Sequence, residues 1–186
     1  MIRIAVMVAN ETEDTELVVP VDIWRRAGFL VKLISVEKKK NVILSHGIKV
    51  SCDEVLMKEN LVQYHAIYLP GGAGHNQFNE EVAPRLVAFA KKNYKNPKIA
   101  FMAICAATEC FYSWGILEPN IKVTCYPGVQ ENKFDTNYVN QDVVVSKNFI
   151  TASGPGTASR FAFKVIEYFE NASKAKAVAK EMLFLK

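Results

Sequence analysis

The chain alternates between short, continuous apolar runs and longer stretches in which apolar residues recur every three or four positions. The runs are four to eight residues long and rich in β-branched side chains. This pattern is typical of strands covered on both faces, as in a parallel sheet. The runs lie at residues 2–8, 29–36, 66–69, 99–104 and 149–152.

Helical periodicity fills the segments between these runs. Residues 13–27 carry acids in the first turn, arginines in the last turn, and Gly28 immediately afterwards as a C-cap. Further helices are expected at residues 80–92, from Cys105 toward Trp114, and after residues 154–157. This alternation predicts one α/β domain, residues 1–186, with a flavodoxin-like, doubly wound, mostly parallel sheet sandwiched by helices.

The segments outside these strands and helices are of two kinds. Residues 41–50 and 121–146 interrupt the alternation, and we expect both to form hairpins added to the main framework. The other segments are loops that follow strands, where ligands of such folds bind. The loops expected to surround one pocket are residues 10–16, 70–72, 104–107 and 153–156.

Charge and length exclude several classes of protein. The 186 residues include 23 basic and 19 acidic side chains, and the densest basic run is residues 38–40. Because no aromatic or glycine-rich motif accompanies that run, specific nucleic-acid binding is not expected. The apolar N-terminus is too short for a signal peptide, and no apolar run approaches the ~20 residues that span a bilayer. A cytoplasmic protein that does not enter membranes is therefore predicted.

The spacing of cysteines and histidines gives no sign of a metal site. The four cysteines form no CxxC pair, and the three histidines do not fall at metal-ligand spacings. We expect no metal, no cofactor, and free thiols in a reducing compartment.

Cys105 differs from the other cysteines in its position along the chain. It follows a predicted buried strand and precedes two small residues, Ala106 and Ala107, that lead into a helix. A nucleophile on a sharp strand-to-helix turn needs small neighbours, and a helix N-terminus lowers the pKa of a thiol. The alternative is a buried structural cysteine, but a position directly after a strand favours chemistry.

Two further groups of residues bear on a reaction at Cys105. Gly71 and Gly72 end another predicted strand, so their backbone N–H groups could approach a ligand and form an oxyanion hole, although a plain turn explains them equally well. Four acids, Glu11, Glu13, Asp14 and Glu16, lie around the start of the first helix. Acids there commonly only complement the helix dipole, and periodicity cannot choose among them.

Four motifs in order resemble the ThiJ/PfpI superfamily, and most closely the branch of the parkinsonism-linked protein deglycase. They are Glu16-Leu-Val-Val-Pro-Val-Asp-Ile-Trp-Arg-Arg-Ala-Gly28, Leu69-Pro-Gly-Gly72, Ala103-Ile-Cys-Ala-Ala107 and Ser153-Gly-Pro-Gly-Thr157. The resemblance covers nearly the whole chain. Four motifs in register are far more specific than any one of them.

The resemblance implies a role for several residues. Cys105 would be the nucleophile, and a protonated Glu16 would hydrogen-bond its sulfur. The backbone at Gly72 and Ala106 would form the oxyanion hole, and Arg26 would lie near the pocket. A homodimer built partly on the first helix is also implied. The apolar side chains of that helix that we expect to contact the second copy are Val18, Val21 and Trp24.

The sequence departs from the family pattern at two positions. Close relatives place a histidine where Tyr126 stands, and often an arginine where His46 stands, so a differently tuned proton relay involving these residues is expected. Protease members carry a histidine directly after the cysteine. Here Ala106 follows Cys105, which argues against a cysteine peptidase.

Two functions are consistent with these residues. The first is a glyoxalase or protein deglycase that acts on methylglyoxal-type 2-oxoaldehydes or glycated substrates, with an oxidative-stress role. The second is a non-enzymatic peroxide sensor or redox-regulated chaperone that works through oxidation of Cys105. Thiazole monophosphate synthesis, a label attached to the superfamily, is disfavoured because the chain has no phosphate-binding P-loop.

Overall fold

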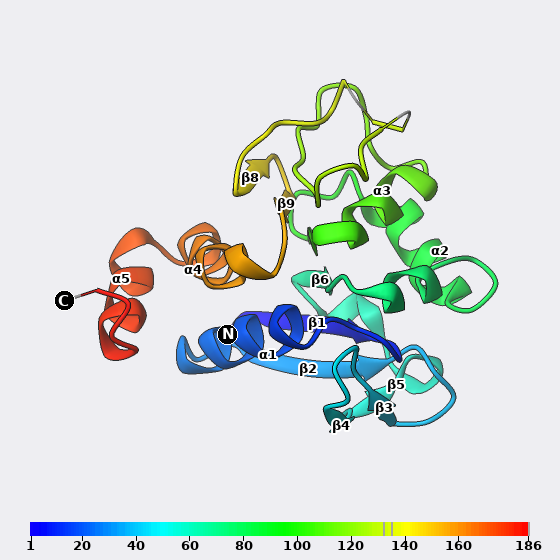
Figure 1. Cartoon of the computed structure of the whole chain (residues 1–186), viewed down its shortest axis with the longest axis horizontal. Coiled ribbons are helices and arrows are strands. Elements are labelled where there is room, and N and C mark those ends of the chain that lie inside the picture. Colours follow the sequence, from blue (N-terminus) through cyan, green and yellow to red (C-terminus); the bar gives the residue numbers. More distant parts are fainter. Residues whose placement is uncertain (132, 135, 186) are drawn as a thin grey trace.

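A computed structural model of the chain describes residues 1–131, 133–134 and 136–185. Its centre is a seven-stranded sheet in the order β5-β2-β1-β6-β7-β9-β8 (Figure 1). The strands are β1 (Arg3–Val8), β2 (Leu30–Ser35), β5 (Glu54–Val55), β6 (Ala66–Leu69), β7 (Ala100–Ile104), β8 (Val143–Ser146) and β9 (Phe149–Ala152). Only β8 runs antiparallel to its neighbour, so the predicted mostly parallel sheet is confirmed.

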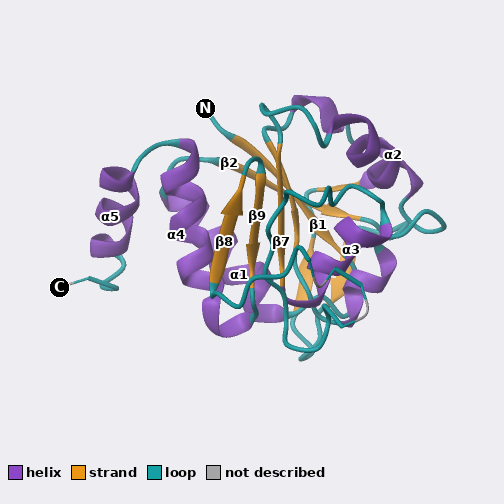
Figure 2. Ribbon diagram, turned by 90° about the horizontal axis from the view of Figure 1, so that it is seen from above, coloured by secondary structure: helices purple, strands orange, loops and turns teal. Residues whose placement is uncertain are grey.

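Helices cover both faces of this sheet (Figure 2). One face carries α1 (Asp14–Arg26) and α4 (Ala158–Phe169), with α5 (Ala172–Glu181) packed outside α4. The other face carries α2 (Pro84–Asn93) and α3 (Glu109–Ser113). The 3-10 helices are η1 (Leu56–Lys58), η2 (Leu61–Gln63), η3 (Ala73–Gln77), η4 (Cys105–Thr108) and η5 (Pro155–Thr157). The flavodoxin-like arrangement predicted from the sequence is therefore confirmed.

Strand β1 shows how the sequence builds two cores at once. Successive side chains of a strand point to opposite faces. Ile4, Val6 and Val8 pack into the cluster that includes α1 and α4. Ala5 and Met7 pack into the cluster that includes α2 and α3. A continuous apolar run is needed because neither face of β1 meets water.

Two α1 residues that were expected to contact a second copy, Val21 and Trp24, instead fix the helix to the core of its own chain. Trp24 is fully buried, and its indole N–H donates a 3.1 Å hydrogen bond to the Ala162 carbonyl of α4. Val21 is only 7% exposed. The prediction that these two side chains form an exposed surface is wrong, because the sheet and α4 already cover them. Val18 alone of the three is exposed, at 49%.

The two predicted hairpins have different outcomes. Strands β3 (Asn41–Ile43) and β4 (Lys49–Ser51) pair antiparallel and confirm the first. The second, at residues 121–146, is wrong. Its described residues form a loop with a single bridge, Val123 to Tyr138, and its last residues become β8, paired with β9. Side chains replace the expected ladder here, since Asn137 donates to the Ile121 carbonyl and Thr151 accepts from the Thr124 N–H.

The helix expected at residues 80–92 begins later than predicted, at Pro84. The Asn79 side chain accepts the backbone N–H groups of Glu81 and Val82, which holds that segment in a turn. Pro84 then suits the first helical turn, where its missing N–H costs nothing. In the described ranges, no helix is long and apolar enough to cross a membrane.

Candidate active site

Cys105 occupies the turn between β7 and η4, as its sequence position predicted. Its φ of +61° lies in the left-handed region, which a side chain other than glycine adopts only at a cost of about 1–2 kcal/mol. Ala106 and Ala107 follow, and Ala107 is completely buried. The thiol is partly exposed, whereas Cys52, Cys110 and Cys125 are buried. A strained, accessible cysteine at a strand end is the geometry of an activated nucleophile.

Two backbone N–H groups lie close to the Cys105 sulfur. They belong to Ala106 and Gly72, and both act to lower the pKa of the thiol. These are the two residues expected to form the oxyanion hole, and the structure brings them together at one side chain. An oxygen bonded to carbon at this sulfur would lie within reach of both donors.

The glycines before η3 permit this close approach. A Cβ atom on Gly71 would lie 2.6 Å from Glu16 Oε2 and 2.8 Å from Cys105 Cβ. Gly72 has a φ of +79°, and a Cβ there would lie 2.5 Å from both the Glu11 carbonyl oxygen and the Glu13 nitrogen. Both positions therefore exclude any side chain. The alternative of a plain turn does not account for these contacts.

Glu16 is completely buried beside the cysteine. Its Oε2 accepts a 2.7 Å hydrogen bond from the Gly71 N–H, and its backbone carbonyl accepts a 2.7 Å bond from the Tyr68 hydroxyl. Burial raises the pKa of Glu16 to about 7, and the charge of Glu13 adds to the rise. The Gly71 N–H and the Cys105 side chain act in the opposite direction. Near neutral pH, the carboxyl group is therefore protonated in a substantial fraction of molecules.

The structure also separates Glu16 from the other acids near the helix start. Glu13 caps α1, since its Oε2 accepts the Glu16 N–H at 2.6 Å. Asp14 pairs with His46, whose backbone N–H and Nδ1 lie 2.9 and 3.1 Å from Oδ2. Glu11 is exposed on a turn with φ of +62°. Of the four acids, only Glu16 is completely buried and bonded to the glycine turn beside Cys105.

The pKa of the Cys105 thiol is raised to about 12, which contradicts the expectation of a lowered pKa. Burial is the largest cause, and the negative charge of ionised Glu16 is the next. The N–H groups of Ala106 and Gly72 offset only part of this effect. The helix that starts at Cys105 opens with a four-residue 3-10 turn, so its dipole is weak. A thiolate is less disfavoured while Glu16 keeps its proton, because the second-largest cause of the raised pKa is then absent.

The interaction between the two side chains is looser than a fully formed hydrogen bond. Glu16 Oε1 is buried and has no partner of hydrogen-bonding geometry within the described part of the chain. The carboxyl group and the thiol nevertheless shift each other's pKa. Since Oε2 is engaged by Gly71, Oε1 is the oxygen available to carry a proton toward the sulfur.

Two other predicted site residues, His46 and Tyr126, have exposed side chains. The His46 side chain is 74% exposed and lies against Asp14. Tyr126 is half exposed and packs near Gly154, where an added Cβ would lie 3.5 Å from its ring. Among the described residues, no hydrogen bond joins His46 or Tyr126 to Cys105 or Glu16. Their part in a proton relay stays a prediction.

Within one chain, Arg26 is not brought to its own Cys105, and its place near a pocket stays a prediction. It lies at the other end of α1 from Glu16, and ten residues of helix span about 15 Å. Its guanidinium bonds Asp22 at 3.1 Å and Glu181 at 3.4 Å. These two carboxylates hold the Arg26 side chain at the protein surface, beside α5.

Sequence reasoning missed two residues that hold the site in place. The Tyr68 hydroxyl fixes the backbone of Glu16, and Tyr68 itself is fully buried against Trp24 and Phe161. His75 Nδ1 lies 2.7 Å from the Gly72 carbonyl oxygen and steadies the glycine turn. A tyrosine inside an otherwise aliphatic strand was the available signal for the first residue. Nothing in the sequence marked the second.

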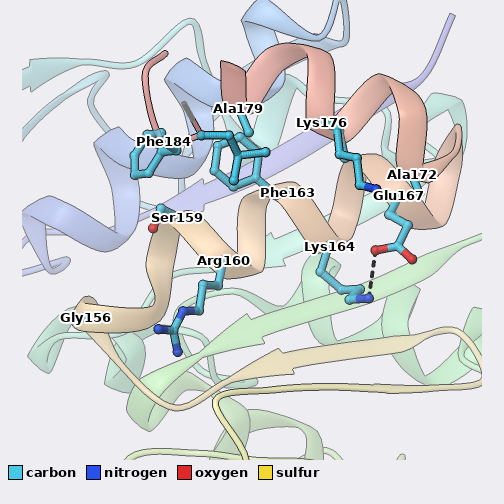
Figure 3. A pocket seen from close by; sticks show the side chains of 12 residues that line it. Gly156, Ser159, Arg160, Phe163, Lys164, Glu167, Ala172, Lys176, Ala179 and Phe184 are labelled. Carbon is cyan, nitrogen blue, oxygen red and sulfur yellow. Dashed lines mark hydrogen bonds and ion pairs between the residues drawn. The ribbon is translucent and has the colours of Figure 1, made fainter. Parts of the chain in front are cut away.

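A second cavity lies away from this site. It has a volume of about 620 Å³ and runs between α4 and α5, under Phe163 and Phe184 (Figure 3). It contains none of the predicted site residues. Its charged side chains include Lys164 and Glu167, which pair with each other at 2.7 Å. The chemistry expected from the sequence therefore belongs to the loops around Cys105.

Comparisons with known proteins identify the family of the chain. The model of the DJ-1/PfpI family matches residues 2–168. The glutathione-independent glyoxalase DJ-1 of Schizosaccharomyces pombe is 29% identical over 191 residues, covering 98% of each protein. Protein DJ-1 homolog B of Arabidopsis thaliana is 32% identical over 178 residues, which cover 95% of this chain but 40% of that protein. A solved structure of oxidized Toxoplasma gondii DJ-1 matches with a TM-score of 0.92 and 30% identity over 98% of each chain. The resemblance to the ThiJ/PfpI superfamily is thereby confirmed, and the chain belongs to the DJ-1/PfpI family.

Proposed function

We propose that the chain is a cysteine-dependent enzyme that converts a 2-oxoaldehyde such as methylglyoxal into a 2-hydroxy acid without a metal or an organic cofactor. The observation that carries this proposal is the arrangement at Cys105. Two backbone donors, from Gly72 and Ala106, and one carboxyl group with a pKa near neutrality, that of Glu16, converge on one accessible sulfur. A relative named glutathione-independent glyoxalase supports the same reaction.

The reaction begins when the Cys105 sulfur adds to the aldehyde carbon. A C–S bond forms, the carbonyl π bond breaks, and the new oxyanion lies toward the N–H groups of Gly72 and Ala106. Protonation gives a hemithioacetal. No charge has to be moved out of the site, since the thiol loses one proton and the oxyanion gains one.

Isomerisation follows at the two substrate carbons. A base removes the proton from the former aldehyde carbon, and a proton returns to the former ketone carbon. The hemithioacetal hydroxyl loses its proton and the former ketone oxygen gains one, which gives a thioester of the 2-hydroxy acid. One carbon is oxidised and its neighbour is reduced, so no external oxidant is required. Glu16 suits both transfers, because a group with a pKa near 7 accepts and returns a proton with little cost. Water then hydrolyses the thioester and restores the thiol.

The same chemistry on an early adduct between a 2-oxoaldehyde and a protein side chain would be a deglycase activity. The accessible face of Cys105 suits a small free aldehyde and an adduct on a mobile side chain alike. Peptidase chemistry is less well supported, because within the described residues no histidine is hydrogen-bonded to the Cys105 thiol.

A second candidate function is peroxide sensing through Cys105. This thiol is the partly exposed one of the four, so an oxidant reaches it before Cys52, Cys110 or Cys125. The oxygens of a sulfinate would meet the donors of Gly72 and Ala106 and a proton from Glu16. The solved Toxoplasma gondii relative is described as oxidized.

We also propose that the protein works as a homodimer. The half-exposed Val18 on α1 is an apolar group that a second copy would cover. The surface is smaller than the sequence suggested, because Val21 and Trp24 are buried within the chain.

The deciding experiment compares methylglyoxal turnover by the wild type, Cys105→Ala and Cys52→Ala. Formation of the hydroxy acid is expected in the wild type and in Cys52→Ala, because Cys52 lies beyond the β3–β4 hairpin. No turnover is expected in Cys105→Ala. A wild type that leaves methylglyoxal unchanged, while peroxide still oxidises Cys105, would favour the sensor function instead.

A further inference from the structure

We propose that the cavity beside Cys105 binds the neutral, polyhydroxylated chain of a sugar-derived 2-oxoaldehyde; this inference rests on the function proposed above. The cavity has a volume of about 360 Å³. Three segments form it: the loop from Cys125 to Pro127, the residues that lead into β8, and the turn after β9. Apart from Tyr126, no residue of these segments was assigned a part in the chemistry at the sulfur.

The cavity adjoins the reacting thiol through the sheet register. Strands β7 and β9 are parallel neighbours, and Ile104 pairs with Ala152. Directly after these paired ends, Cys105 opens η4 and Ser153 opens the turn that lines the cavity. Neighbouring strands lie about 4.8 Å apart where they pair. The cavity therefore begins beside the strand end that carries Cys105, within reach of a substrate chain bound to the sulfur.

A second set of bonds holds the cavity wall against the turn that carries Cys105. The Thr108 hydroxyl of η4 donates to the Thr124 carbonyl at 3.0 Å, and the Thr124 N–H donates to Thr151 Oγ1 of β9 at 2.9 Å. Tyr126 follows two residues later and packs near Gly154. The wall is thus positioned relative to the sulfur by side-chain hydrogen bonds from both neighbouring elements.

The lining of the cavity is polar but carries no unpaired charge. Its polar side chains include Tyr126, Tyr138, Asn140, Gln141 and Ser153. Asp142 also lines it, but that carboxylate forms an ion pair with Arg160. A phosphate or carboxylate on the ligand would find no free cation among the lining residues. Neutral donors and acceptors beside aromatic rings suit a chain of hydroxylated carbons, which offers hydroxyl groups and C–H faces together.

Several of these groups are available to a ligand. Among the described residues, the side chains of Tyr126, Gln141 and Ser153 have no hydrogen-bond partner, and the Tyr138 hydroxyl makes only a 3.5 Å contact with Asn140 Oδ1. Such side chains can bond to solvent or to a ligand. Exchanging water for ligand hydroxyls keeps their hydrogen bonds and costs little.

The size of the cavity also favours a ligand longer than a three-carbon aldehyde. A water molecule occupies roughly 30 Å³ of liquid, so the cavity corresponds to roughly a dozen waters. A three-carbon aldehyde attached to Cys105 would displace few of them. A six-carbon 2-oxoaldehyde of the kind formed when a hexose loses water carries three hydroxyl groups beyond its reacting carbons. Its reaction is the one described above, with the C–S bond formed and broken at the same carbon and the chain unchanged.

Binding without chemistry is the first test. The Cys105→Ala protein is titrated with 3-deoxyglucosone, and in a parallel sample with methylglyoxal, while backbone amide NMR shifts are recorded. Saturable shifts around Tyr126, at residues 138–142 and at residues 153–157 are expected with 3-deoxyglucosone only. Shifts confined to residues 71–72 and 105–107 with both aldehydes would overturn the proposal.

Kinetics give the second test. Asn140→Leu and Tyr138→Phe each remove a neutral hydrogen bond to the chain. Each is expected to lower kcat/KM for 3-deoxyglucosone roughly 3- to 10-fold relative to the same variant's kcat/KM for methylglyoxal. Asn41→Leu, an exposed asparagine on the distant hairpin with the same replacement, should keep the wild-type ratio. An unchanged ratio in all three variants would refute the proposal.

The two tests separate failure of the subsite from failure of the reaction. Turnover of methylglyoxal with no preference change in Asn140→Leu and no shifts at residues 138–142 refutes the subsite and leaves the proposed function standing. A wild type that turns over neither aldehyde refutes the proposed function. In that case the titration of Cys105→Ala still decides whether the cavity binds the polyhydroxylated chain.

Discussion

The Gly71 N–H donates a 2.7 Å hydrogen bond to Glu16 Oε2, so one oxygen of this buried carboxyl group is held by the backbone. The other oxygen, Oε1, has no such partner within the described residues. A carboxyl group fixed in this way cannot rotate to exchange its oxygens without losing the bond. The free oxygen is the one that can carry a proton, and the carboxyl group and the Cys105 thiol shift each other's pKa.

The first prediction concerns proton transfer by Glu16. Glu16→Gln keeps the shape and the Gly71 contact but cannot exchange a proton, so methylglyoxal turnover should fall by about 10²-fold or more. The readout is kcat from lactate formation. Glu11→Gln, at an exposed acid on the adjacent turn, should stay close to wild type. Equal losses in the two variants would mean that the effect is general electrostatics rather than proton transfer.

Glu16→Gln also separates the two candidate functions. Sensing requires only a hydrogen bond to the oxidised sulfur, which the amide N–H₂ supplies. Peroxide should therefore still convert Cys105 to a sulfinate in this variant, measured as a mass gain of two oxygens. Full aldehyde turnover in Glu16→Gln, with Cys105→Ala inactive, would show that Cys105 is required and that Glu16 is not the group that transfers the proton.

The second prediction is a fall in stability between pH 4.5 and 7. The pKa of Glu16 is raised from 4.5 to about 7 by folding, so the folded protein holds a proton that the unfolded chain has released in this range. Stability from this group is fully present below pH 4.5 and is lost as pH rises through 7. The linked free energy is up to about 3 kcal/mol.

Urea unfolding at pH 5 and pH 8 measures this effect as a difference between proteins. The wild type should lose more free energy of unfolding over that interval than Glu16→Gln, whose side chain does not titrate. Other groups contribute equally to both proteins and cancel. Parallel pH profiles would show that Glu16 is not protonated in the folded state.

The third prediction concerns the reactivity of the thiols. Iodoacetamide should label Cys105 before the other three, because Cys52, Cys110 and Cys125 are each at most 5% exposed and burial raises their pKa values as well. The rate for Cys105 at pH 7.5 should nevertheless be slow, since ionised Glu16 disfavours a thiolate. Glu16→Gln removes that charge, so labelling of Cys105 should become faster. A slower or unchanged rate would contradict the electrostatic coupling.

The order of strands and helices could be predicted from the sequence because each element carries its own period. Strand β1 is apolar on both faces and α1 is apolar on one, and these patterns are local. The position of Cys105 followed from the same logic, since it ends one strand and precedes two alanines. The loop at residues 121–146 could not be predicted, because its shape depends on bonds from distant side chains such as Thr151 and Asn137.

The electrostatics of the site were also beyond the sequence. A helix N-terminus next to a cysteine suggests a lowered thiol pKa. The direction of the pKa shift, however, depends on burial and on the charge of Glu16, and only the folded chain brings Glu16 close to Cys105. Arg26 shows the same limit. The resemblance implied that Arg26 lies near the pocket, whereas within one chain Asp22 and Glu181 hold it at the opposite end of α1 from Glu16.

The fourth prediction uses two glycines with the same backbone conformation. Gly72 and Gly47 have φ of +79° and +86°, but an added Cβ at Gly72 meets backbone atoms at 2.5 Å, whereas at Gly47 it meets nothing within 4 Å. Gly47→Ala should cost about 1 kcal/mol of unfolding free energy, from the left-handed backbone alone. Gly72→Ala should cost about 1–3 kcal/mol more, from the clash. Equal losses in urea unfolding would remove the argument for close packing at Gly72.

The last prediction tests the homodimer and the part of α1 on which it is built. Light scattering of the wild type at micromolar concentration should give about twice the 20.8 kDa chain mass. Val18→Asp places a charge on the exposed face of α1, where a second copy would bury it without a partner, so this variant should be monomeric and remain folded. Val145→Asp is the matched control, since Val145 is 42% exposed on β8 at the opposite part of the sheet and should leave the dimer intact. Trp24→Ala, in contrast, should lower stability by about 3–5 kcal/mol without acting on the interface directly, because Trp24 is fully buried within its own chain. A wild type that scatters as a monomer would remove the dimer, and a dimeric Val18→Asp would move the contact away from α1.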